Sequence, residues 1–250
     1  MKLASSTNLI CASLLTGVYD VNRNQELAED NFEAIRVWYD SVKSLGLSAV
    51  IFHNNFSPAT ESLYTTDAIG FVRVDFDTIY NPNIYRYFIY KDFLELHQSQ
   101  IDNVFVTDIT DVEVLKNPFG EELFLERSEA LFCGDEPKKL DNEWMNDHST
   151  HLRNNIDGFA EYEKNHQQSP LLNCGIIGGN IATVLRLMTE LVAIHSAHAP
   201  SNRTAYTLDM GAFNYAARTL FGDNIAHGSP INTVFKGYET ERKDCWFRHK

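Results

Sequence analysis

The chain has 250 residues, of which 44% are hydrophobic and 22% are charged, as is usual for globular proteins. With 21 Lys and Arg against 34 Asp and Glu, its formal net charge is -13. An acidic chain has no electrostatic attraction for a phosphate backbone, so we expect no nucleic-acid partner. No stretch reaches the roughly 18 to 20 apolar residues that span a bilayer, so we expect no transmembrane segment.

The four cysteines are far apart in the sequence and form no CxxC pair of the kind found in zinc knuckles and redox sites. They are Cys11, Cys133, Cys174 and Cys245. Reduced thiols packed as small apolar side chains are the simplest interpretation. We therefore expect a cytoplasmic protein, either free or peripheral at the inner membrane face.

The first fifty residues predict a βαβ unit. Residues 9–15 form a continuous apolar run, which is typical of a strand buried on both faces. Residues 26–44 carry apolar side chains at helical spacing, and Gly46 supplies the stop. Residues 48–52 are a second apolar strand, and a helical crossover makes the two strands parallel.

The remaining chain continues the alternation of strands and helices, with residues 117–143 as a loosely patterned stretch. Residues 171–177 are apolar, Gly178 and Gly179 predict a break after them, and Asn180 is expected to cap the next helix. The tail at 221–250 is expected to be irregular. The other predicted elements are strands at 69–75 and 103–108 and helices at 83–98, 180–195 and 208–220.

No internal repeat or linker interrupts this pattern, so we expect one α/β domain over 1–250 with a mixed, mostly parallel sheet flanked by helices. We divide this domain at residue 115 into two halves, residues 1–115 and residues 116–250.

The sequence VFVTDITD predicts a site at the carboxyl end of a buried strand, where it places Asp108 and Asp111. Open α/β sheets bind ligands at that edge, and paired carboxylates suit Mg²⁺ or Mn²⁺ carrying a diphosphate. Residues three apart on a straight strand point to opposite faces, so both carboxylates reach one ion only if the chain turns after Asp108. The alternative is that the two acids cap the next helix.

Short polar and glycine-rich motifs accompany this acidic pair in a fixed order along the chain. They are Thr16-Gly17-Val18-Tyr19, Asn173-Cys174-Gly175, Gly178-Gly179, Asp209 followed by Asn214, His227-Gly228, and Lys236-Gly237-Tyr238. From about residue 9 to residue 238 this order resembles the GT-A class of nucleotide-sugar glycosyltransferases, and most closely its retaining, glycogenin-like branch. The DxxD spacing differs from the DxD of that class, and Gly211 stands where a second acid is sometimes found.

The resemblance implies that residues 1–115 are the nucleotide-binding half and that residues 116–250 bind the acceptor and complete the metal site. It also implies a role for each of the residues named above. Mn²⁺ or Mg²⁺ would be held by Asp108, Asp111 and His227, and Asp209 and Asn173 would lie at the reacting sugar. The implied nucleotide-sugar-binding residues are Thr16, Gly17, Tyr19, Arg86, Asp108, Gly178, Gly179 and Lys236. Structural alternatives stay open: His227 as a surface residue, Lys236 as a solvated one, Arg86 stacked on Tyr90, and the two glycines as a turn.

The activity implied is metal-dependent transfer of a hexose from a nucleotide diphosphate sugar, with UDP-hexose as the expected donor, to a saccharide or lipid-linked acceptor. Retention of configuration is expected, in a setting such as bacterial polysaccharide synthesis. Two other classes remain: another phosphate enzyme, such as a nucleotidyltransferase or a HAD-like phosphatase, and a noncatalytic sugar-binding domain.

Overall fold

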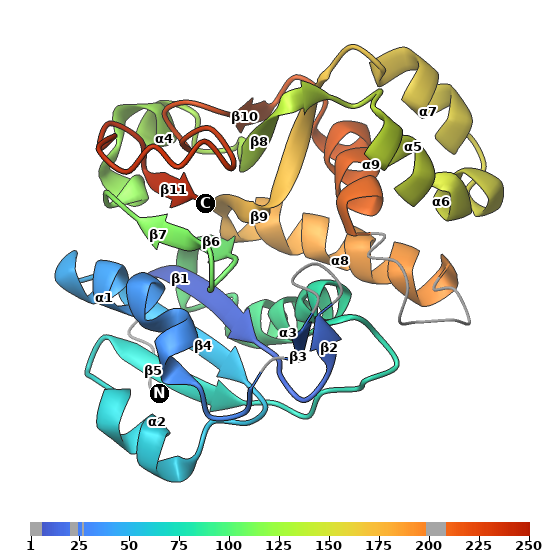
Figure 1. Ribbon diagram of the computed structural model, residues 1–250. Coiled ribbons are helices and arrows are strands. Elements are labelled where there is room, and N and C mark those ends of the chain that lie inside the picture. Colours follow the sequence, from blue (N-terminus) through green and yellow to red (C-terminus); the bar gives the residue numbers. More distant parts are fainter. Residues whose placement is uncertain (1–6, 21–24, 27, 199–208) are drawn as a thin grey trace.

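The computed structural model describes residues 7–20, 25–26, 28–198 and 209–250. Within these residues, seven strands form a central sheet in the order β10-β8-β9-β6-β1-β4-β5 (Figure 1). Their bounds are β1 Thr7–Leu14, β4 Ser48–His53, β5 Ile69–Arg73, β6 Ile101–Thr107, β8 Leu131–Lys139, β9 Pro170–Asn180 and β10 Ile225–His227. Only β9 is antiparallel to its neighbours, so the predicted mixed, mostly parallel sheet is confirmed.

Two short antiparallel ribbons accompany the sheet. They are β7 (Val112–Val114) with β11 (Phe247–His249), and β2 (Tyr19–Asp20) with β3 (Gln25–Glu26). The helices of the described residues are α1 Arg36–Ser44, α2 Pro58–Tyr64, α3 Pro82–His97, α4 Glu122–Glu126, α5 Glu143–His148, α6 Thr150–Asn155, α7 Phe159–His166, α8 Ile181–His198 and α9 Asp209–Phe221, with 3-10 turns at Phe32–Ile35 and Pro118–Gly120.

The sheet is buried on both faces because alternate residues of each strand point to opposite sides. In β1, Leu9 and Cys11 face a core shared with α3, α8 and α9. Ile10 and Ala12 face a second core that includes Trp38 of α1. A strand buried on both faces reads as a continuous apolar run, which is why the sequence identifies β1 readily.

The predicted helix over 26–44 is wrong in its first part. Glu26 lies in β3, and helical structure begins only with the 3-10 turn at Phe32. Asp30 has a φ of 50°, a left-handed conformation that no α-helix contains. The end of the helix is confirmed, because α1 stops at Ser44 and Gly46 has a φ of 64°. Leu27 lies outside the described residues.

The break predicted at Gly178 and Gly179 is also wrong, because β9 continues through both glycines to Asn180. Gly178 is paired with Phe105 of β6 and with Phe132 of β8, so ladders on both sides hold the backbone extended. Asn180 then caps α8 as expected, since its Oδ1 accepts a hydrogen bond from the Thr183 amide at 2.8 Å.

The tail is less irregular than expected, since it contains β10 and β11. Of the helix predicted over 208–220, α9 begins at Asp209, and Leu208 lies outside the described residues. All four cysteines are buried and free, as expected. Within the described residues, none of the helices is both long and apolar enough to cross a membrane.

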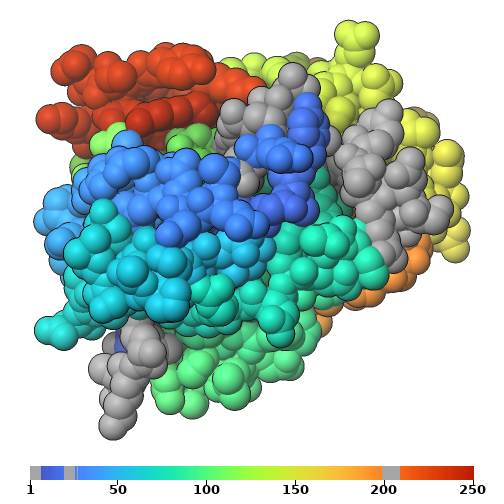
Figure 2. Space-filling view, turned by 60° about the horizontal axis from the view of Figure 1, so that its bottom comes forward, coloured from blue at the N-terminus to red at the C-terminus, as the bar shows by residue number. Residues whose placement is uncertain are grey.

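The topology brings several chain segments to one edge of the sheet. β1, β4, β6, β8 and β10 run in the same direction and end at this edge, whereas β9 runs the other way and begins there. The C-terminal segment then returns to the N-terminal half: in Figure 2 it lies, in red, directly beside the blue residues around α1, and residues of both line a common groove.

Candidate metal centre and donor site

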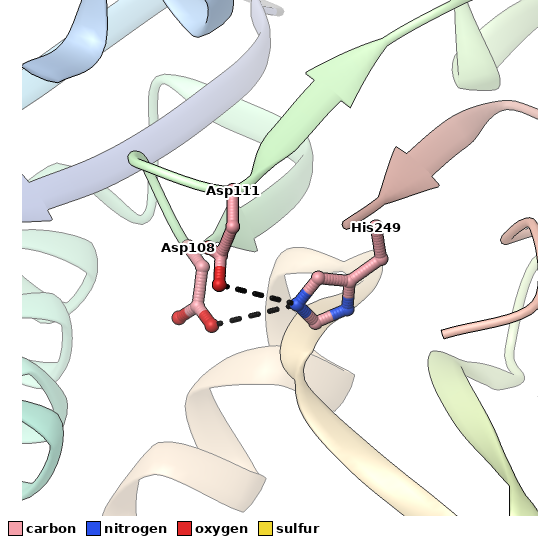
Figure 3. Close-up of side chains that lie close together, drawn as sticks. All are labelled: Asp108, Asp111 and His249. Atoms are coloured by element: carbon pink, nitrogen blue, oxygen red, sulfur yellow. Dashed lines mark ion pairs between the residues drawn. The ribbon is translucent and has the colours of Figure 1, made fainter. Parts of the chain in front are cut away.

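Asp108 is the first residue after β6, and Asp111 is the last residue before β7. The chain bends between them, and this is the turn that two carboxylates three residues apart require if they are to face one point. The backbone amide of Asp108 donates a hydrogen bond to the carbonyl oxygen of Gly175 at 2.8 Å, which anchors the start of the turn to β9. Figure 3 shows both carboxylates directed toward the ring of His249.

His249 reaches the two aspartates through the pairing of β11 with β7, in which it lies opposite Val112. Its Nε2 is 3.8 Å from Asp108 Oδ2 and 3.9 Å from Asp111 Oδ2 (Figure 3). Ligand atoms of the three residues all lie within 4.8 Å of one another. A strand pair far apart in sequence thus completes the cluster.

His249 is 2% exposed, and burial lowers its pKa to about 4, against the opposing effect of Asp108. The imidazole is therefore neutral near pH 7, which is the form that binds metals. Its Nδ1 is buried and has no hydrogen-bond partner among the described residues. Two carboxylate oxygens and one imidazole nitrogen form a donor set suited to a divalent ion such as Mn²⁺.

Gly175 forms the floor of this cluster. A Cβ at this position would lie 2.4 Å from Cε1 of His249 and 2.6 Å from Oδ2 of Asp108, closer than side-chain atoms approach each other. Asn173 Oδ1 accepts a hydrogen bond from the Gly175 amide at 2.7 Å, which holds this part of β9 in place. Gly175 therefore lets His249 and Asp108 pack directly against the β9 backbone, which brings their ligand atoms close enough together to share a cation.

Arg86 on α3 supplies a buried positive charge behind the cluster. Its Nη1 donates to Asp108 Oδ1, and its Nη2 lies 3.4 Å from the carbonyl oxygen of Cys174 and 3.7 Å from Asp209 Oδ2. Burial raises the pKa of Asp209, and the positive charge of Arg86 opposes this rise. Arg86 therefore links the first residue of α9 to the candidate metal ligand after β6.

Lys236 adds a second positive charge at this edge. Its backbone is left-handed, with a φ of 57°, and its Nζ lies 5.1 Å from the ring centroid of Phe235, which in turn contacts the His249 ring. Burial raises the pKa of Glu136, and the charge of Lys236 opposes that rise. Asn173 Nδ2 donates to Glu136 Oε1 at 2.9 Å, so Asn173 connects Glu136 with Gly175.

The remaining predicted donor residues lie in two places. Thr16 and Gly17 follow β1 at the same edge, and Tyr19 in β2 is half exposed. Gly178 and Gly179 are instead inside β9, opposite Phe105 and Val104, where a Cβ on Gly178 would meet the Phe105 ring at 2.2 Å. Gly178 thus makes room for a core side chain, and a Cβ on Gly179 would approach the carbonyl oxygen of Ala130 to 2.9 Å.

The structure also separates His227 from the two aspartates. Its Nδ1 lies 3.0 Å from Asp135 Oδ2, at the end of β10. The histidine that reaches Asp108 and Asp111 is His249, which the sequence interpretation did not include. No local sequence signal marks it, because β11 has three residues and its partner strand lies some 135 positions earlier.

The fold is similar to that of a solved structure, the galactosyltransferase LgtC in complex with donor and acceptor sugar analogs. The TM-score is 0.51, the match covers 97% of this chain and 86% of that chain, and the sequences are 13% identical. No protein-family model matches the chain, and no curated protein matches it in sequence. The similarity, together with the mostly parallel sheet flanked by helices, shows that the chain has a GT-A, Rossmann-like fold.

Proposed function

We propose that this protein is a metal-dependent glycosyltransferase that moves a hexose from a nucleotide diphosphate sugar to a saccharide or lipid-linked acceptor. The observation that carries the proposal is the cluster of Asp108, Asp111 and His249 over Gly175, at the carboxyl edge of a GT-A sheet. Nucleotide-binding α/β folds bind their ligands at this edge.

Asp108, Asp111 and His249 would hold a Mn²⁺ or Mg²⁺ ion, with His249 in the place that the sequence interpretation gave to His227. When bound, such an ion supplies positive charge against the diphosphate that leaves in the reaction. Lys236 would add a second positive charge to the same group, since its side chain lies near His249 and Glu136.

The donor nucleotide, for which we propose a uridine diphosphate, would lie along the loop of Thr16, Gly17 and Tyr19. This loop leaves β1 next to β6, and Ala12 is paired with Thr107, the residue before Asp108. A ligand that contacts both the loop and the metal cluster therefore needs to span only adjacent strands.

The surroundings of Asp209 favour retention of configuration. An inverting enzyme needs a carboxylate that can reach the acceptor hydroxyl as a base. The Asp209 side chain is 7% exposed and lies 3.7 Å from Arg86 Nη2, and it accepts a hydrogen bond from Cys174 Sγ at 3.5 Å. A carboxylate held in this way suits a polar contact near the sugar, with Asn173 beside Cys174, better than it suits removal of a proton from the hydroxyl group of an acceptor.

Donor hydrolysis with and without Mn²⁺, over a panel of nucleotide diphosphate sugars, tests the proposal. Without an acceptor, we expect metal-dependent release of the nucleoside diphosphate. When an acceptor is present, we expect an α-linked donor to give an α-linked product, which NMR of the anomeric proton identifies. Release of inorganic phosphate from the panel would favour a phosphatase. Sugar binding without hydrolysis would favour a noncatalytic domain, and a β-linked product would contradict retention.

A further inference from the structure

The loop after β1 is braced by a side chain from the neighbouring strand. β1 and β4 run in parallel and remain paired through Leu14 and His53, the last residues of the two strands. Beyond this point the backbone ladder ends. Asn54, the next residue after β4, continues the connection with its side chain.

Both ends of the Asn54 amide bind the same backbone residue. Oδ1 accepts a hydrogen bond from the Thr16 amide at 2.9 Å, and Nδ2 donates to the Thr16 carbonyl at 2.8 Å. The Asn54 side chain thus imitates one further pair of a β-ladder. Thr16 is 4% exposed, so its backbone groups would otherwise be poorly solvated.

Two further contacts fix this arrangement. Asn55 Nδ2 donates to Thr16 Oγ1 at 3.0 Å, and the carbonyl of Asn54 accepts from Arg73 Nη1 at 2.7 Å. Gly17 follows with a φ of 81°, and a Cβ there would lie 3.3 Å from Asn55 Nδ2. The turn at Gly17 is therefore held by the residues that follow β4 and by Arg73 of β5, in addition to the conformational freedom of the glycine itself.

We infer that Asn54 is a positioning residue for nucleotide binding: it holds the Thr16–Gly17 turn in its binding conformation before the ligand arrives. The inference rests on the proposed function, in which this turn contacts the donor nucleotide. Binding to a preformed loop does not have to offset the conformational entropy of ordering that loop. Loss of the Asn54 side chain therefore weakens binding although no contact to the ligand is removed.

The test compares Asn54→Ala with Asn180→Ala. Asn180 is a matched control because its amide also makes two hydrogen bonds, to the Thr183 amide and the Ser128 carbonyl, at the opposite edge of the sheet. Affinity for UDP in the presence of Mn²⁺ is measured by calorimetry, and affinity for Mn²⁺ alone is measured separately.

We expect Asn54→Ala to bind UDP about tenfold more weakly, with unchanged affinity for Mn²⁺ alone and faster hydrogen exchange at the Thr16 amide. The KM for donor should rise by a similar factor, while kcat changes little. Asn180→Ala should leave all five quantities unchanged. A merely structural role for Asn54 would instead lower stability in both variants and leave their UDP affinity alike, and that result would overturn the inference.

Asn55→Ala provides a second, milder variant, since it removes only the bond to Thr16 Oγ1, and we expect UDP binding about threefold weaker. If Asn54→Ala does not fold, unchanged UDP affinity in Asn55→Ala overturns the inference. If the unaltered protein binds none of UDP, ADP and GDP with Mn²⁺, the proposed function itself fails. If the unaltered protein binds UDP and the variants bind it equally well, only the inference about Asn54 fails.

Discussion

The amide of Asp108 and the carbonyl of Gly175 are joined by a 2.8 Å hydrogen bond between β6 and β9. The same glycine lies under the Asp108 carboxylate and the His249 ring. Gly175 therefore fixes the backbone of a candidate metal ligand and also allows the side chains of Asp108 and His249 to pack against it, and the first prediction follows from these two roles.

Gly175→Ala should weaken Mn²⁺ binding at least about tenfold, because the new methyl group occupies the space between His249 and Asp108 and displaces one of them. Gly120→Ala is the control, since a Cβ at Gly120 meets nothing within 4 Å. Calorimetric titration of Mn²⁺ into both variants checks the prediction. Equal affinities would mean that the cluster is not where the ion binds.

Asp108→Ala should abolish Mn²⁺ binding and lower the free energy of unfolding by about 3 kcal/mol, because it leaves the Arg86 guanidinium buried with a weaker partner. The double variant Asp108→Ala with Arg86→Met should regain part of this stability but none of the metal affinity. Urea unfolding gives the stabilities of the two single variants and the double variant. Additive losses would show that the pair is not coupled.

His249→Ala should weaken Mn²⁺ binding at least about tenfold, whereas His227→Ala should not change it. The reason is geometric: His249 lies within 4 Å of both aspartates, and His227 lies against Asp135 instead. Metal titration of the two variants, with thermal unfolding as a check on folding, distinguishes them. The reverse result would favour the metal role predicted for His227 from the sequence.

His195 should make the protein less stable in acid. It is 1% exposed on α8, with its ring stacked on Tyr87, and burial lowers its pKa to about 3. The unfolded chain has a histidine pKa of about 6.5, so between about pH 6.5 and 3 the unfolded state binds one more proton and stability falls as pH falls.

The slope from this residue is about 1.4 kcal/mol per pH unit. The variant His195→Leu should lack this slope. Its free energy of unfolding relative to that of the unaltered protein should therefore rise by about 2 kcal/mol when the pH is lowered from 7 to 5. Urea unfolding of both proteins at several pH values measures the difference, and contributions from other groups cancel. Parallel stability curves would show that His195 has the same pKa in the folded and the unfolded protein.

The parts of the fold that the sequence predicts well are those whose signal is local. β1, β4 and β6 are apolar runs because both faces of each strand are buried. α8 begins at the asparagine cap that the sequence predicts, Asn180. The cap of α3 is Asn81, which lies two residues before the predicted start of that helix. For the same reason Asp108 was found, since it directly follows an apolar run.

The parts that were missed depend on contacts between distant residues. The sequence of β8 lacks a clear strand pattern because the second half of the strand is exposed. Its strand conformation depends on pairing with β9. His249 belongs to the site only because β11 pairs with β7. Asn54 has an ordinary polar sequence context, and its importance appears only when β1 and β4 are placed side by side.

The pairing of β11 with β7 places a candidate metal ligand, His249, on the last strand of the sheet pair. The candidate ligands come from residues 108, 111 and 249, so the ion would tie the C-terminal segment to the middle of the chain. Ion binding should then protect that segment against local opening, and a protease added to the metal-free protein should cut between β10 and β11 faster than in the presence of Mn²⁺. A bound ion would then stabilise the position of the last strand in addition to any role in the reaction.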